Sequence, residues 1–126
     1  SGIVSFIFCL YGFRNFGRVK MSEAVWSIIK YKPKAGCEDE FKKNGLTRLA
    51  EMMEKYSATW SLIELDNGEI VQINRNPSIE ATLEGQIEGM EWLDSVDHLL
   101  EKDVGGSRTQ AYSGLEMDVQ HSFQNK

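Results

Sequence analysis

The sequence is poor in the residues that build disulfide frameworks and metal centres. Among its 126 residues there are two cysteines, two histidines and two prolines. Cys9 and Cys37 form no CxxC motif and have no histidine at ligand spacing, which argues against a disulfide framework or a zinc site. Glycine-rich phosphate loops and Ser-His-Asp patterns are also missing. We therefore expect two free thiols in a reducing cytoplasm, no metal and no cofactor.

Long apolar runs and a basic surface are missing as well. Ile3–Leu10 is an apolar run of eight residues, whereas a membrane-spanning helix needs about 20. The net charge is −5, and the bases of residues 1–20 are accompanied by no acidic residue, so the rest of the chain is more acidic still. An acidic body repels nucleic-acid phosphates. These features predict neither a membrane nor a nucleic-acid partner.

Residues 1–20 differ in character from the rest of the chain. They contain four of the six phenylalanines, and their bases come after the apolar run, which is unlike the order in a secretory signal. Met21 opens a segment whose charge and patterning match the remainder of the chain, so Met21 is the expected natural start. We interpret 1–20 as an apolar and basic leader, either non-native or an added arm, and 21–126 as a single domain.

Periodicity and turn residues predict four strands and two helices. Ala24–Tyr31 is rich in β-branched and aromatic residues, while 38–56 has apolar residues at three- and four-residue steps behind an acidic first turn. Asn76-Pro77-Ser78 is a helix-start signal, and the apolar steps after it run to Lys102. The other strands are predicted at 57–65, 69–75 and 111–119. The order β-α-β-β-α-β predicts an α+β, ferredoxin-like fold, with a four-stranded antiparallel sheet and two helices on one face.

The second predicted helix combines an apolar stripe with two glycines. Leu83 and Ile87 belong to the stripe that we expect to be buried. Gly85 and Gly89 lie four residues apart and would let another backbone come close, at a cost of about 1 kcal/mol each in helix propensity. In the last strand, Glu116 is expected on a solvent-exposed face.

A tight hairpin is predicted around Asp66-Asn67-Gly68. Asn-Gly is the preferred pair for a two-residue type I′ turn because both central residues need positive φ. Such a turn pairs Leu65 with Ile70. By strict alternation, the hairpin face that packs under the helices then holds Trp60, Leu62, Val71 and Ile73. The opposite face holds Ser61, Ile63, Leu65, Ile70, Gln72 and Asn74.

The predicted face without helices is half apolar and half neutral polar, which is unusual for a solvated surface. The same face of a second copy, related by a two-fold axis, would cover it. We therefore expect a homodimer or a higher homo-oligomer that associates through its sheet.

The chain resembles the dimeric α/β-barrel proteins, in particular the antibiotic-biosynthesis-monooxygenase-like group. The similarity spans about Ala24 to Val119 and rests on AVWSIIKYKPKAG running into an acidic helix, on GEIVQINRNPSIEA entering a helix, and on EGMEWLDSVDHLL. The resemblance implies two sheets that face each other across an interior pocket. Members of the family include cofactor-independent monooxygenases, haem-degrading enzymes, other small-molecule enzymes and proteins of no known activity.

The chain departs from that family in two respects. Cofactor-independent oxygenase members are associated with an asparagine and a tryptophan around the pocket, whereas the predicted register puts Asn74 and Trp60 on opposite faces. Haem-handling members use a histidine ligand, and the histidines here are His98, near the end of the second helix, and His121, in the tail. The resemblance therefore disfavours haem and leaves open whether the chain is an enzyme.

Candidate ligand contacts are provided by the predicted helix-free face. Ser61, Gln72 and Asn74 carry neutral polar groups that need partners when buried, and Trp26 and Tyr31 are candidate pocket walls. One hypothesis is a pocket between the sheet and the dimer partner that takes a small apolar or aromatic molecule, in a binding protein or a cofactor-independent monooxygenase-like enzyme. The other is a non-catalytic homo-oligomer whose sheet face is only a packed interface. No catalytic residue is assigned.

Overall fold

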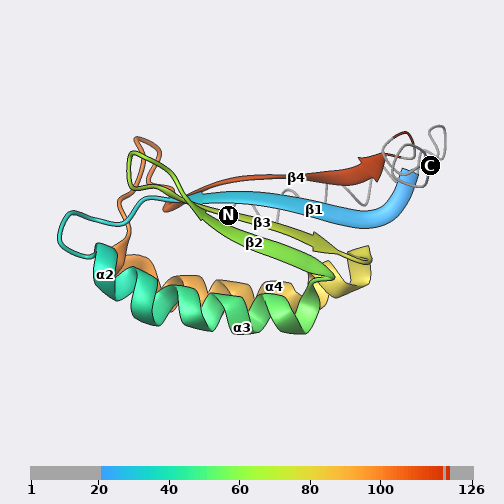
Figure 1. Ribbon diagram of the computed structural model, residues 1–126, viewed down its shortest axis with the longest axis horizontal. Helices are drawn as coiled ribbons and strands as arrows, with labels where there is room; N and C mark the ends of the chain where they lie inside the picture. Colours follow the sequence, from blue (N-terminus) through green and yellow to red (C-terminus); the bar gives the residue numbers. More distant parts are fainter. Residues whose placement is uncertain (1–20, 118, 120–126) are drawn as a thin grey trace.

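The computed structural model describes residues 21–117 and 119, which are arranged around one four-stranded antiparallel sheet of order β2-β3-β1-β4. The elements, in chain order, are β1 (Met21–Tyr31), α2 (Glu38–Glu40), a π-helical segment η1 (Phe41–Gly45), α3 (Leu46–Tyr56), β2 (Thr59–Glu64), β3 (Ile70–Asn76), α4 (Ile79–Val96), a 3₁₀ helix η2 (Asp97–Leu99) and β4 (Thr109–Met117). Both long helices lie on the same side of the sheet (Figure 1). This arrangement confirms the predicted α+β, ferredoxin-like fold.

The first helical stretch is continuous but contains one wide turn. It begins after a turn at Gly36, whose φ is 87°, and runs through α2, η1 and α3, as predicted for 38–56. The π-helical segment ends at Gly45, where the helix lies close to the core. A Cβ at that position would stand 3.2 Å from the Phe41 ring and 3.3 Å from Val96, so only glycine fits without a shift.

The β2–β3 hairpin has a register that differs by one residue from the prediction. Glu64, not Leu65, is opposite Ile70. The Leu65 N–H donates to Glu69 O at 2.8 Å, so the loop between them has three residues, 66–68, instead of the predicted two. Gly68 alone takes a positive φ, of 88°, and its N–H donates to the carbonyl oxygen of Leu65 at 3.0 Å. Asn67 keeps a negative φ and accepts from the Glu69 N–H through its side chain at 3.0 Å. This is a three-residue loop with glycine in the left-handed position, which is another common hairpin connection.

A slip of one residue exchanges the faces of β3. Trp60 is opposite Asn74 and Leu62 is opposite Gln72, so the two amides share the helix-covered face with residues of β2 that pack on the core. Val71 and Ile73 instead lie on the opposite face with Ser61 and Ile63. The predicted split of Trp60 and Asn74 between two faces is therefore wrong, as is the predicted helix-free position of both amides, because the register sets the face of every residue in a strand.

Helix α4 starts where predicted and ends earlier. The Ser78 hydroxyl accepts from the Ala81 N–H at 3.1 Å, which caps the first turn. The helix ends at Val96 instead of Lys102, because the chain returns across the end of β1. There Lys34 N–H donates to Leu99 O and Glu101 N–H donates to Lys32 O, both at 2.8 Å, in place of helical bonds.

The buried face of α4 is also offset from the predicted stripe. Trp92, Leu93 and Val96 are buried, whereas Leu83 is 45% exposed and Ile87 is 71% exposed. The prediction that both belong to the buried face is wrong for a geometric reason. The side of the helix that approaches α3 carries Gly85, where a Cβ would lie 3.2 Å from the Tyr56 ring, so small residues and not the largest ones mark this contact.

Strand β4 also differs from the prediction in one residue. Glu116 is predicted to face solvent but is 6% exposed. Its carboxylate accepts from Arg75 Nε at 3.0 Å, from Arg75 Nη2 at 3.2 Å and from the Trp26 indole N–H at 3.0 Å. A buried carboxylate requires such partners, and they lie on β1 and β3, on the same face of the sheet.

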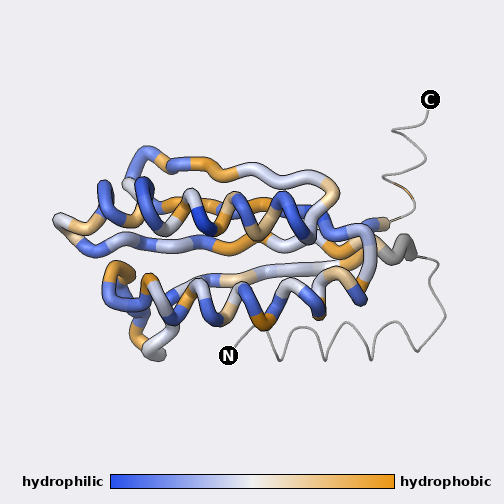
Figure 2. The backbone as a smooth tube through the Cα atoms, turned by 90° about the horizontal axis from the view of Figure 1, so that it is seen from below, coloured by the Kyte–Doolittle hydropathy of each residue, from blue (hydrophilic) through white to orange (hydrophobic). Residues whose placement is uncertain are grey.

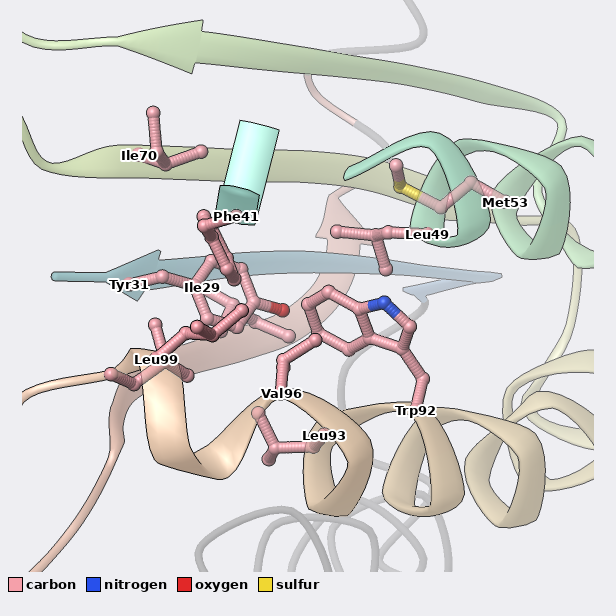
Figure 3. Packing of buried hydrophobic residues seen from close by; sticks show 11 residues of the cluster. Ile29, Tyr31, Phe41, Leu49, Met53, Ile70, Trp92, Leu93, Val96 and Leu99 are labelled. Atoms are coloured by element: carbon pink, nitrogen blue, oxygen red, sulfur yellow. The ribbon is translucent and has the colours of Figure 1, made fainter. Parts of the chain in front are cut away.

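The core lies between the sheet and the helices. Figure 3 shows Tyr31, Phe41 and Trp92 pointing toward one another from β1, η1 and α4. The rings of Tyr31 and Trp92 meet edge to face, with centroids 5.5 Å apart, and the indole N–H of Trp92 donates to Gly45 O at 2.7 Å. Hydrophilic and hydrophobic positions alternate along both long helices (Figure 2). Their apolar sides therefore bury this aromatic centre against the sheet.

The predicted leader, the proposed start at Met21 and the polar tail involve segments outside the described residues. Within residues 21–117 and 119, no helix has both the length and the apolar content needed to cross a bilayer. The predicted boundary between 1–20 and the domain stays a prediction.

Candidate functional site

A cavity of about 120 Å³ lies between the sheet and the two long helices of a single chain. We call it the amide cavity. The strands β1, β3 and β4 form one side of it, and α3 and α4 form the other. None of the side chains that line it is Asp, Glu, Lys, Arg or His. The amide cavity is therefore a neutral site with polar groups supplied mainly by the sheet.

Three amide side chains on alternate residues of β3 give the cavity its name. Gln72 Nε2 donates to Asn74 Oδ1 at 2.9 Å, and Asn74 Nδ2 donates to Asn76 Oδ1 at 3.1 Å. The three residues are 6–7% exposed. They share one face because side chains two residues apart on a strand point the same way. We call Gln72, Asn74 and Asn76 the amide ladder.

Groups on neighbouring elements fix both ends of the amide ladder. At one end the Tyr31 hydroxyl donates to Gln72 Oε1, and burial raises the pKa of that phenol above its ordinary value. Tyr31 thus stays protonated and acts as a hydrogen-bond donor at neutral pH. At the other end Asn76 Nδ2 donates to the Thr82 hydroxyl at 3.1 Å, and Ser57 Oγ donates to Asn76 Oδ1 at 2.7 Å.

The wall opposite the amide ladder is largely apolar and flexible in shape. Met52 and Met53 from α3 and Trp92 from α4 line it. Gly89 also lines the cavity, and a Cβ there would have only the Met52 methyl within 4 Å, at 3.9 Å. Thioethers adapt to irregular shapes, and an indole offers a large flat contact surface. This wall therefore suits a small planar or apolar body.

The serine of β1 adds a hydroxyl to the polar side of the cavity. Ser27 is 8% exposed, lines the cavity and makes no side-chain hydrogen bond to any residue in the described part of the chain. It lies directly opposite Asn74 on one side and Ser113 on the other in the sheet. A cross-strand row of three polar side chains therefore faces the helices.

The structure separates the five residues predicted to contact a ligand into two groups. Gln72, Asn74 and Tyr31 line the amide cavity, under the helices. Ser61 and Trp26 lie on the opposite face of the sheet, because they pair with Ile73 and Arg75. The amide cavity thus belongs to one chain, whereas the sequence predicted a pocket between the sheet and a second subunit.

Sequence reasoning missed two residues that complete the polar side. The sequence predicts Asn76 as a helix-start residue, although Gln72, Asn74 and Asn76 also repeat at the two-residue period of a strand. It predicts Ser27 as part of a strand rich in β-branched and aromatic residues. The sequence pattern that could have identified Ser27 is the alternation in β1, where Val25, Ser27 and Ile29 share a face and only the serine is polar.

The face of the sheet opposite the helices is apolar at its centre. Ile28 of β1 pairs with Ile73 of β3 and with Tyr112 of β4. Ile28 is 42% exposed, Tyr112 is 62% exposed, and Ile63 of β2 is 41% exposed. We call Ile28, Ile63, Ile73 and Tyr112 the open-face patch. Ion pairs flank it at two places, formed by Arg75 with Glu116 and by Lys30 with Glu69.

Other residues with potential chemistry lie away from the cavity. His98 is exposed in η2, and Glu64 is exposed and paired with Lys42 at 2.6 Å. Cys37 is a half-buried free thiol before α2. Among the described residues, no group of three or more His, Cys, Asp or Glu side chains is placed to hold a metal ion.

Comparison with known proteins adds no family assignment. No protein-family model matches the chain, and no curated protein sequence matches it. The amide cavity and the open-face patch are therefore the two features from which a function can be inferred.

Proposed function

We propose that this protein binds a small uncharged molecule in the amide cavity. The observation that carries the proposal is a ladder of three buried amides that faces an apolar wall across an unfilled space. Binding sites commonly combine a mostly apolar lining with a few placed polar groups. A charged ligand is disfavoured because no lining side chain carries a countercharge, and burying an unpaired charge is costly.

The resemblance to antibiotic-biosynthesis-monooxygenase-like proteins extends this proposal to a planar aromatic ligand. The corrected register supports it in one respect, since Trp60 and Asn74 share a sheet face. Trp60 is not a cavity residue, however, and its indole donates to Glu54 at 3.3 Å. The lining groups favour binding and orientation over proton transfer, since the Tyr31 phenol stays protonated.

Methyl NMR tests the binding proposal directly. Protein labelled at the methionine methyl groups is titrated with toluene, phenol and 2-pyridone. Met52 and Met53 line the cavity, while Met117 is 55% exposed near the end of β4 and serves as an internal control. We expect shifts at Met52 and Met53 and none at Met117. Absence of a shift at both cavity methionines with all three compounds would refute the proposal.

A filled-cavity variant provides the matched control. Gly89→Leu places a side chain where only the Met52 methyl lies within 4 Å, so it should occupy ligand space and abolish the shifts. Glu84→Leu introduces the same side chain at an exposed position of the same helix and should leave binding intact. Ligand-induced shifts that persist in Gly89→Leu would place the binding site elsewhere.

We also propose homodimerisation through the open-face patch, the feature that favours the second candidate function, a homo-oligomer without catalysis. Three strands expose large apolar side chains at its centre, and the described residues place no helix over it. A stable dimer typically buries about 800 Å² on each partner. Sedimentation velocity should give a dimer for the unaltered chain and a folded monomer for Ile28→Lys. A monomer at every concentration of the unaltered chain would exclude this assembly.

A further inference from the structure

Several polar groups in the amide cavity have hydrogen-bonding capacity that the described protein residues leave unused. Gln72 Nε2 carries two hydrogens and donates one, to Asn74. Asn74 Oδ1 has two lone pairs and accepts one hydrogen bond, from Gln72. Ser27 is 8% exposed, and its hydroxyl makes no side-chain hydrogen bond to a described residue. The second hydrogen of Gln72 Nε2, a lone pair of Asn74 Oδ1 and the Ser27 hydroxyl, which can donate and accept, therefore stay available at the cavity surface.

These three groups lie close together on one face of the sheet. Ser27 is directly opposite Asn74 in the β1–β3 ladder, and Gln72 lies two residues away on the same strand as Asn74. Side chains of directly opposed residues have Cβ atoms about 4.5–5.5 Å apart, and diagonal neighbours are about 7–8 Å apart. A single small ring can therefore reach all three groups with one edge.

The arrangement of donors and acceptor determines the chemistry of that edge. A carbonyl oxygen has two lone pairs and accepts from both Gln72 Nε2 and the Ser27 hydroxyl, and an adjacent N–H donates to Asn74 Oδ1. Such a pair of groups is the edge of a cyclic amide. Toluene offers no polar group, and phenol would have to make both kinds of contact through one oxygen, whereas a cyclic amide divides them between two adjacent atoms.

We infer that the amide cavity selects an uncharged one-ring compound with a carbonyl beside an N–H, such as a lactam, a pyridone or a pyrimidine-type ring. The inference rests on the proposed function, because it names the ligand class of the same cavity. The volume of about 120 Å³ agrees with this size. An apolar cavity of about 150 Å³ is known to accept one benzene ring.

Two isomers test the inference on the unaltered protein. 3-Methyl-2-pyridone keeps the N–H, whereas 1-methyl-2-pyridone has the same composition and replaces the N–H with a methyl group. Affinities come from titrations that track the Met52 and Met53 methyl signals. Since one hydrogen bond contributes about 0.5–1.5 kcal/mol, the isomer with the N–H should bind about three- to tenfold more tightly. Equal affinities would overturn the inference.

Serine variants on the two sheet faces test the role of Ser27. Ser27→Ala removes a hydroxyl that no described residue uses and should weaken 3-methyl-2-pyridone about three- to tenfold. Ser61→Ala makes the same change on the opposite face and should leave the affinity unchanged. An unchanged affinity in Ser27→Ala would overturn the assigned contact. If Ser27→Ala fails to fold, the comparison of isomers on the unaltered chain still decides.

The outcomes separate this inference from the binding proposal. If both isomers and toluene shift Met52 and Met53 with equal affinity, the cavity binds small rings without selecting a cyclic amide, and only the inference fails. If no compound shifts the signal of either methionine, both the proposed function and the inference are wrong.

Discussion

The close approach of α3 and α4 makes two neighbouring glycines respond in opposite ways to the same substitution. Alanine is about 1 kcal/mol more favourable than glycine within a helix. At Gly89 a Cβ would meet only the Met52 methyl, at an ordinary 3.9 Å. We therefore expect Gly89→Ala to raise the free energy of unfolding by about 0.5–1 kcal/mol.

Gly85→Ala should not raise the free energy of unfolding, because a contact with Tyr56 offsets the gain in helix propensity. The added Cβ would lie 3.2 Å from two atoms of the Tyr56 ring, and the hydroxyl of Tyr56 is held by Glu88 at 3.0 Å. Overpacking of this kind costs about 1–3 kcal/mol. Gly85→Ala should therefore be less stable than Gly89→Ala by at least about 1 kcal/mol.

Urea denaturation with a shared m-value measures both variants, because a change in midpoint at constant m reports stability. Truncation of the ring supplies the control. In a Tyr56→Leu background, Gly85→Ala should recover most of the helix-propensity gain, since the obstructing ring is absent. Equal stabilisation by Gly85→Ala and Gly89→Ala in the unaltered background would refute the packing of α3 against α4.

Two further predictions concern the hairpin loop and the acid stability of the loop before β4. Gly68→Ala should lower the free energy of unfolding by about 1–2 kcal/mol in urea melts, because its φ of 88° strains any residue with a Cβ although no atom lies within 4 Å. An unchanged midpoint would contradict the three-residue loop. Hydrogen bonds from Arg108 and Lys102 lower the pKa of Asp97, so this carboxylate stabilises the fold above its ordinary pKa, and the contribution is lost as pH falls through the lowered pKa. Asp97→Asn should therefore reduce the loss of stability on acidification below about pH 4, measured by thermal melts across pH, and an identical acid profile would contradict it.

The topology was accessible from the sequence because each element carries a local signal. The capping role of Ser78, the acidic first turn at Glu38 and the β-branched run of β1 all act within a few residues. The order of elements then selects the ferredoxin-like arrangement. The fold therefore depended on several agreeing signals, and no single turn decided it.

The position of the candidate site depended on one turn, and the local signal there was ambiguous. Asn67-Gly68 fits a two-residue loop with two positive φ values and also a three-residue loop with one. The second is present, and Gln72 and Asn74 consequently lie under the helices. The sequence predicts the two amides as polar groups in need of partners, and in the structure they bond to Tyr31 and Asn76 of the same chain.

The amide ladder links stability and binding through one strand. Gln72 and Asn74 are each bonded on two sides, so the ladder is ordered without a ligand, and binding need not fix these side chains again. Preorganisation of this kind lowers the entropic cost of association. Ile73, which lies between the two amides in sequence, belongs to the open-face patch on the other side of the sheet. Strand β3 therefore carries the polar side of the amide cavity on one face and part of the proposed dimer surface on the other. A dimer contact that restrains Ile73 would also restrain the backbone of Gln72 and Asn74.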